Sequence, residues 1–160
     1  MMVGFTLVRG VRVALPTPSD PRRPAGIVGG PGYGAVMEWK IELVFVPVSD
    51  VDRAKSFYVD QVGFNADYDE QVNERLRFVQ LTPPGSACSI AIGTGLIDSE
   101  PGSLRNLQVV VEDVAAARKQ LIERGVQASE IDVQVWGSFV TFADPDGNTW
   151  ALQQLPSRSG

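Results

Sequence analysis

The chain of 160 residues contains no histidine and a single cysteine, Cys88. Without imidazole, the commonest catalytic base and the commonest transition-metal ligand are both missing. One cysteine cannot form an internal disulfide, which fits a reducing cytoplasm. No apolar run is long enough to span a membrane. A net charge of −5 disfavours nucleic acid or an anionic membrane as a partner. These absences predict an acidic cytoplasmic protein that binds neither.

A strand followed by a helix occurs twice along the chain. In the first copy, residues 41–48 form an apolar, β-branched run, Asp50 stands at an N-cap position, and Gly63 closes the helix. The same signals return about sixty positions later, with a strand at 107–111 and an N-cap at Asp113. Two copies of one unit indicate a duplicated module, because a solenoid needs three or more repeats.

Turns rich in proline and glycine extend the match into three further strands per copy. Each module therefore reads strand, helix and three strands, over about 38–93 and about 104–155. We expect strands near 40–48, 65–71, 75–82 and 87–93 in module 1, and helices at 51–62 and 114–124. The domain spans 37–156. Residues 1–36, rich in Gly, Pro and Arg, are predicted to be a flexible extension, and 157–160 a tail.

Several motifs resemble one known family. They are the duplicated unit, the helix start VSDVDRAKSFY, the phrase GF after that helix, and DPDGN before the last strand. Together, over Met37 to Leu155, they resemble the vicinal-oxygen-chelate superfamily, which includes glyoxalase I, extradiol dioxygenases and bleomycin-resistance proteins. The resemblance implies an α+β fold in which two tandem βαβββ modules form a curved mixed sheet around a cleft. It also implies a homodimer.

In enzymes of that superfamily, the first and last strands of each module hold a divalent metal. The resemblance and the repeat place the four ligand positions at Leu43, Ser89, Asn106 and Ala151. A catalytic divalent metal needs about three protein ligands, usually imidazole or carboxylate. None of the four is either, and strand alternation directs Glu42 to the opposite face. We therefore predict no metal cofactor.

Residues that share the strand face of these four positions define the predicted ligand pocket. It is neutral, partly amide and partly apolar, as small-molecule sites usually are. Trp136, beside the seventh strand, either stacks on a planar ligand or belongs to the core. A second interpretation of the amides is that Asn106, Gln108 and Gln153 only face solvent or bond one another. The predicted ligand-binding residues are Leu43, Phe45, Ser89, Asn106, Gln108, Trp136, Thr149, Ala151 and Gln153.

Other polar residues have two interpretations each. Arg75 and Arg77 share a face of the third strand; on the cleft side they would bind a ligand carboxylate, but a solvated edge is preferred. Asp144, Asp146 and Asn148 resemble the start of a calcium loop, but the spacing favours a hairpin turn. Cys88 is predicted to be a small buried side chain on the helix-packed face.

The preferred function is a metal-free, small-molecule binding protein similar to the bleomycin-resistance members. An acidic surface would suit a cationic ligand. The alternative is a metal-dependent lyase, isomerase or dioxygenase of the same superfamily whose ligands lie at other positions. The sequence therefore leaves enzymatic activity open.

Overall fold

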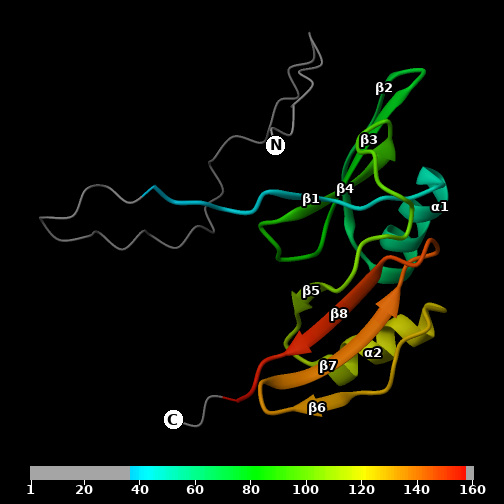
Figure 1. Ribbon diagram of the computed structural model, residues 1–160. Helices are drawn as coiled ribbons and strands as arrows, with labels where there is room; N and C mark the ends of the chain where they lie inside the picture. The colour runs from blue at the N-terminus through cyan, green and yellow to red at the C-terminus, as the bar shows by residue number, and fades with distance from the viewer. Residues whose placement is uncertain (1–36, 158–160) are drawn as a thin grey trace, which may run out of the picture. The chain divides into compact units, whose positions relative to one another are not determined.

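The computed structural model describes residues 37–157 (Figure 1). Internal contacts divide the chain into Met1–Glu38 and Trp39–Gly160, and both modules belong to the second unit. The predicted flexible extension, 1–36, and most of the predicted tail lie outside the described residues. None of the helices within 37–157 is long and apolar enough to cross a membrane.

Module 1 forms a four-stranded mixed sheet, which we call the first sheet. Its strands lie in the order β1-β4-β3-β2, with β1 parallel to β4 and the other pairs antiparallel. One helical stretch connects β1 to β2, and its second half is a π-helix. The elements are β1 (Leu43–Phe45), α1 (Val51–Ser56), η1 (Phe57–Val62), β2 (Asn65–Asn73), β3 (Leu76–Thr82) and β4 (Ser89–Thr94).

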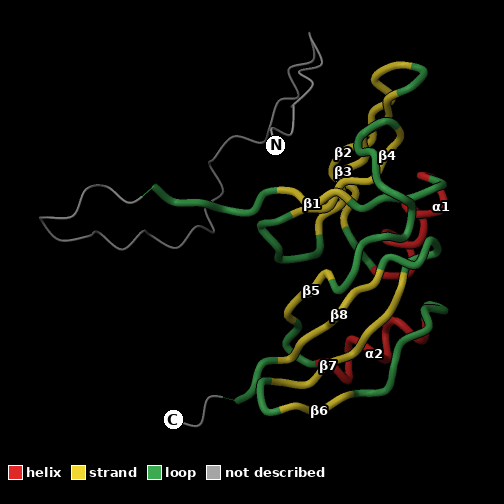
Figure 2. The backbone as a smooth tube through the Cα atoms, viewed as in Figure 1, coloured by secondary structure: helices red, strands yellow, loops and turns green. Residues whose placement is uncertain are grey.

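Module 2 repeats this arrangement as the second sheet, with strand order β5-β8-β7-β6 (Figure 2). Again the first and last strands, β5 and β8, pair in parallel. The α+β fold of two tandem βαβββ modules is therefore confirmed, with the strands divided into two mixed sheets. The elements are β5 (Leu107–Val110), α2 (Val114–Glu123), β6 (Asp132–Gln134), β7 (Gly137–Ala143) and β8 (Thr149–Gln154).

The predicted helix starts are confirmed, and the first strand is shorter than predicted. Asp50 accepts a hydrogen bond from the Arg53 backbone N–H, and Asp113 accepts one from Ala116. Of the predicted run 41–48, only 43–45 form the strand. Pro47 has no N–H to donate, so the ladder cannot continue through it.

Each helix packs on one side of its own sheet, α1 against β4, and α2 against β7 and β8 (Figure 1). On this side, Val46, Ile90, Trp150 and Leu152 all belong to the core. The two modules share this core through an aromatic cluster formed by Phe57, Tyr58, Phe64, Phe142 and Trp150.

The DPDGN segment is a turn between β7 and β8 that also contacts module 1. Buried Asp144 accepts hydrogen bonds from the Tyr58 hydroxyl at 2.8 Å and from Asn148 Nδ2 at 2.7 Å. Asn148 Nδ2 also donates to the Pro47 carbonyl at 2.8 Å. Asp146 accepts from the backbone N–H of Ser49. The preferred hairpin-turn interpretation is confirmed, since the segment joins the antiparallel strands β7 and β8.

Candidate functional site

We use "open face" for the side of each sheet opposite its helix. On the first sheet, Leu43 pairs with Ser89, and Phe45 pairs with Ala91. Paired residues share a face, and their neighbours Val44, Val46 and Ile90 point into the helix-packed core. Three predicted site residues, Leu43, Phe45 and Ser89, therefore lie together on the open face of the first sheet.

A chain of hydrogen bonds crosses this open face. Gln80 Nε2 donates to Ser89 Oγ at 3.1 Å, and the hydroxyls of Ser89 and Thr82 lie 2.6 Å apart. The Thr82 hydroxyl also donates to a carboxylate oxygen of Asp67. The sequence did not predict Gln80, Thr82 and Asp67 as site residues, because their faces follow from the strand register, which has an irregularity in β2 between Ala66 and Tyr68.

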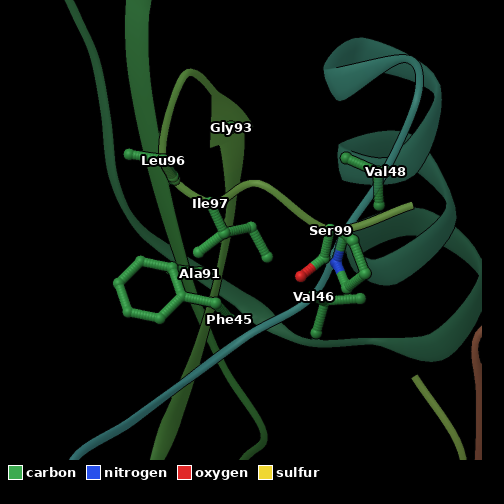
Figure 3. Close-up of a pocket in the computed structure, with 9 residues that line it drawn as sticks. Phe45, Val46, Val48, Ala91, Gly93, Leu96, Ile97 and Ser99 are labelled. Carbon is green, nitrogen blue, oxygen red and sulfur yellow. The ribbon is translucent and has the colours of Figure 1, made fainter. Parts of the chain in front are cut away.

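A small hollow lies at the other end of the same face (Figure 3). Its volume is about 40 Å³, enough for little more than a methyl group or a water molecule. Phe45 and Ile97 lie side by side at its edge, and Leu96 packs over Gly93, where any Cβ would clash. The linker after β4 thus adds Leu96 and Ile97 to the site, two residues that the sequence did not predict there.

The second sheet carries the other group of predicted residues. Gln108 pairs with Ala151, and Gln108 Nε2 donates to Gln153 Oε1 at 2.6 Å. Gln153 Nε2 donates to the Trp136 carbonyl at 3.0 Å, and the Trp136 side chain is 63% exposed. Gln108 and Gln153 therefore bond one another, as the second interpretation of the amides allowed, and Trp136 is not a core residue.

Asn106 does not take the position that the repeat predicted. It precedes β5, its φ of 54° is left-handed, and its backbone N–H donates to Thr149 Oγ1 at 2.8 Å. Gln108 pairs with Ala151 in its place. The repeat offset conserves side-chain parity but shifts the β5–β8 pairing by two residues, because pairing depends on the partner strand as well as on the local sequence.

The four ligand positions implied by the resemblance do not fit a catalytic metal. Leu43 and Ala151 offer no donor atom, the Ser89 hydroxyl is engaged by Thr82 and Gln80, and Asn106 lies outside β5. Within 37–157, no three Asp, Glu or Cys side chains are grouped as a metal would require. No reaction step through a metal follows from these residues.

The two arginines do not share a face of β3 as the sequence predicted, because only Arg77 lies in that strand. Arg77 forms ion pairs with Asp69 and with Asp52 of α1, both at 2.9 Å, so it faces the helix side. Exposed Arg75 lies in the turn before β3. Cys88 precedes β4 and is only partly buried, which corrects the predicted burial. Desolvation and then Glu42 raise the pKa of its thiol, which disfavours a nucleophilic thiolate.

A larger groove is lined mainly by residues of the helix side. Its volume is about 360 Å³, and it lies between the end of η1 and the helix α2. Phe64, Leu121 and Phe142 form part of its wall, and Arg124 is its charged lining residue. It includes none of the nine predicted site residues.

Two tandem βαβββ modules, each with one open sheet face, define a glyoxalase-type scaffold. The family model described as "Glyoxalase/Bleomycin resistance protein/Dioxygenase superfamily" matches residues 40–152. The chain therefore belongs to this superfamily, which confirms the resemblance.

Individual proteins of known structure or sequence are also similar to this chain. TnmS3, an antibiotic binding protein from Streptomyces sp. CB03234, is 36% identical with a TM-score of 0.70, covering 76% of this chain and all of that one. A glyoxalase/bleomycin resistance protein from the same organism is 39% identical with a TM-score of 0.65, covering 72% of this chain and all of that one. YetH, an uncharacterized protein of Bacillus subtilis, is 26% identical over 117 residues, covering 72% of this chain and 98% of YetH.

Proposed function

We propose that this protein is a cytoplasmic small-molecule binding protein of the bleomycin-resistance type that acts without a catalytic metal. The likeness to the antibiotic-binding protein TnmS3, which aligns along its whole length, carries the proposal. The open faces support it, because their ligand positions do not fit a metal, while their exposed aromatic side chains and the exposed Gln108 amide suit a small organic ligand.

Ligand capture rests on both open faces. On the first sheet, Leu43 and Phe45 offer apolar surface beside Ser89. On the second, Trp136 offers a large exposed ring, and exposed Gln108, held by its bond to buried Gln153, offers an amide that can orient polar groups. Asn106, Thr149 and Ala151 border the second group.

A homodimer is the assembly that fits these sheets. β1 and β5 are each an edge strand, and edge strands leave backbone groups available for pairing with a second copy. Trp39 and Ile41, directly before β1, are 89% and 74% exposed. Large apolar side chains beside an open sheet edge are typical of a protein interface.

The test is a screen of antibiotics and other small organic compounds. A true ligand should raise the melting temperature by several degrees, because it binds only the folded state. Phe45→Ala should weaken binding about tenfold through lost apolar contact. Binding should persist after treatment with a chelator. Val133→Ala is the matched control, since Val133 is exposed on β6, outside both groups.

Two results would contradict the proposal. One is a ligand whose binding disappears on chelation and returns with a divalent metal. The other is a screen in which no compound shifts the melting temperature, or in which Phe45→Ala and Val133→Ala behave alike.

A further inference from the structure

The strand register arranges the open face of the first sheet as a trough. One row across the four strands contains Phe45, Ala91, Gln80 and Tyr68, in that order. Phe45 and Tyr68 are 40% and 41% exposed, whereas Ala91 is buried. The two aromatic walls are three strand spacings apart, roughly 14 Å. Ala91 lines the small hollow together with Leu96 and Ile97, so the part of the row open to a planar ring system is the stretch from Gln80 to Tyr68.

The two faces of this sheet carry different charges. Asp67 faces the trough, since its carboxylate accepts a hydrogen bond from Thr82. Glu70 lies two residues after Tyr68 and pairs with Phe78, so it is on the same face. The open face of these four strands contains no basic residue. Asp69, between them in sequence, faces the helix side and is paired with Lys55 and Arg77. Asp67 and Glu70 form no ion pair with any residue in 37–157.

All hydrogen bonds in the series on this face run in the same donor-to-acceptor direction. A carboxylate only accepts, so the single Thr82 hydroxyl hydrogen goes to Asp67. Ser89 must then donate to Thr82, and Gln80 donates to Ser89. Each of these three side chains therefore donates to the next one in the direction of Asp67. The oxygens that remain for a ligand, Asp67 Oδ1 and Gln80 Oε1, are acceptors.

From this arrangement we infer that the open face of the first sheet binds a planar organic cation that carries N–H donors, with Asp67 as its counter-ion. The inference rests on the proposed function and names the ligand class of that site. The cation forms a charge-assisted hydrogen bond to Asp67 and a second bond to Gln80. Its ring system lies over Gln80 beside Tyr68, whose aromatic face also attracts positive charge.

Fluorescence titration with three ring systems of equal size tests this inference. 9-Aminoacridine is a cation with N–H donors, 10-methylacridinium is a cation without them, and acridone is uncharged. Wild-type protein should bind 9-aminoacridine about tenfold tighter than acridone, with 10-methylacridinium between them, the scale of one charge-assisted hydrogen bond. Asp67→Asn should remove most of that preference and leave acridone binding within about twofold.

Asp60→Asn is the matched control, because Asp60 is exposed on η1 and its substitution changes the net charge equally. Equal affinity for 9-aminoacridine and acridone, or equal effects of the two substitutions, would overturn the inference. Bound acridone would then leave the proposed function standing. If none of the three binds, the inference is overturned as well, and the compound screen decides the proposed function separately.

Discussion

Tyr58 is a buried residue of module 1 that forms hydrogen bonds with two residues of module 2. Its hydroxyl donates to Asp144 at 2.8 Å and accepts from Trp150 Nε1 at 3.0 Å, and its side chain is fully buried. Burial, and then the nearby Asp144 carboxylate, hold the pKa of Tyr58 above its ordinary value of 10.0. The folded protein therefore keeps a proton that the unfolded chain loses at alkaline pH.

This proton gives stability a pH dependence. The contribution of Tyr58 is fully present below the ordinary pKa of tyrosine and is lost as pH rises above it. Between about pH 10 and 11.5, the free energy of unfolding should fall by up to about 1.4 kcal/mol per pH unit from this group alone. Tyr58→Phe should remove that slope, and should cost about 2 kcal/mol at neutral pH because Trp150 Nε1 loses its acceptor.

Urea unfolding at a series of pH values measures both effects. Tyr68→Phe is the control, since Tyr68 is 41% exposed on β2. A wild-type slope that Tyr58→Phe leaves unchanged would show that the Tyr58 proton does not control alkaline stability.

At the scale of elements, the two helices begin with the same cap. Asp50 has φ −135° and ψ 109°, and Asp113 has φ −135° and ψ 106°. Each carboxylate accepts from the backbone N–H three residues on, at 3.0 Å for Arg53 and 2.9 Å for Ala116. The duplication thus preserves the helix start to within a few degrees.

Removal of one cap should destabilise the protein modestly. Asp113→Ala should lower the free energy of unfolding by about 1 kcal/mol, because an N–H of the first turn of α2 loses its acceptor. Glu112→Ala is a control with the same loss of charge one position earlier. Thermal and urea unfolding measure the difference, and equal values for the two variants would rule out the capping contribution.

At the scale of the whole molecule, the proposed dimer predicts a definite mass. A chain of 17.3 kDa should sediment as a species of twice that mass. Trp39→Glu combined with Ile41→Glu should shift it to the monomer, because a charge buried in an apolar interface is costly. Analytical ultracentrifugation measures this. A wild-type monomer at micromolar concentration would contradict the dimer, and Val135→Glu, on another exposed apolar residue, is the control.

The sequence alone determined the features whose signals are local. Asp50, Asp113 and Gly63 act through bonds within one helical turn, so the helices could be placed from spacing. The alternation of Val44, Val46 and Ile90 against Phe45 and Ser89 identified the two faces, because side chains alternate along a strand wherever it pairs.

Only the tertiary structure decided how these faces are composed. Gln108 replaces Asn106 opposite Ala151, and the irregularity in β2 brings Asp67 to Thr82, because strand register depends on pairing with distant residues. The net charge of −5 indicated an acidic protein but not where its acids lie. Folding separates Asp69, which is paired on the helix side, from Asp67 on the open face, since each residue of a strand faces one side only.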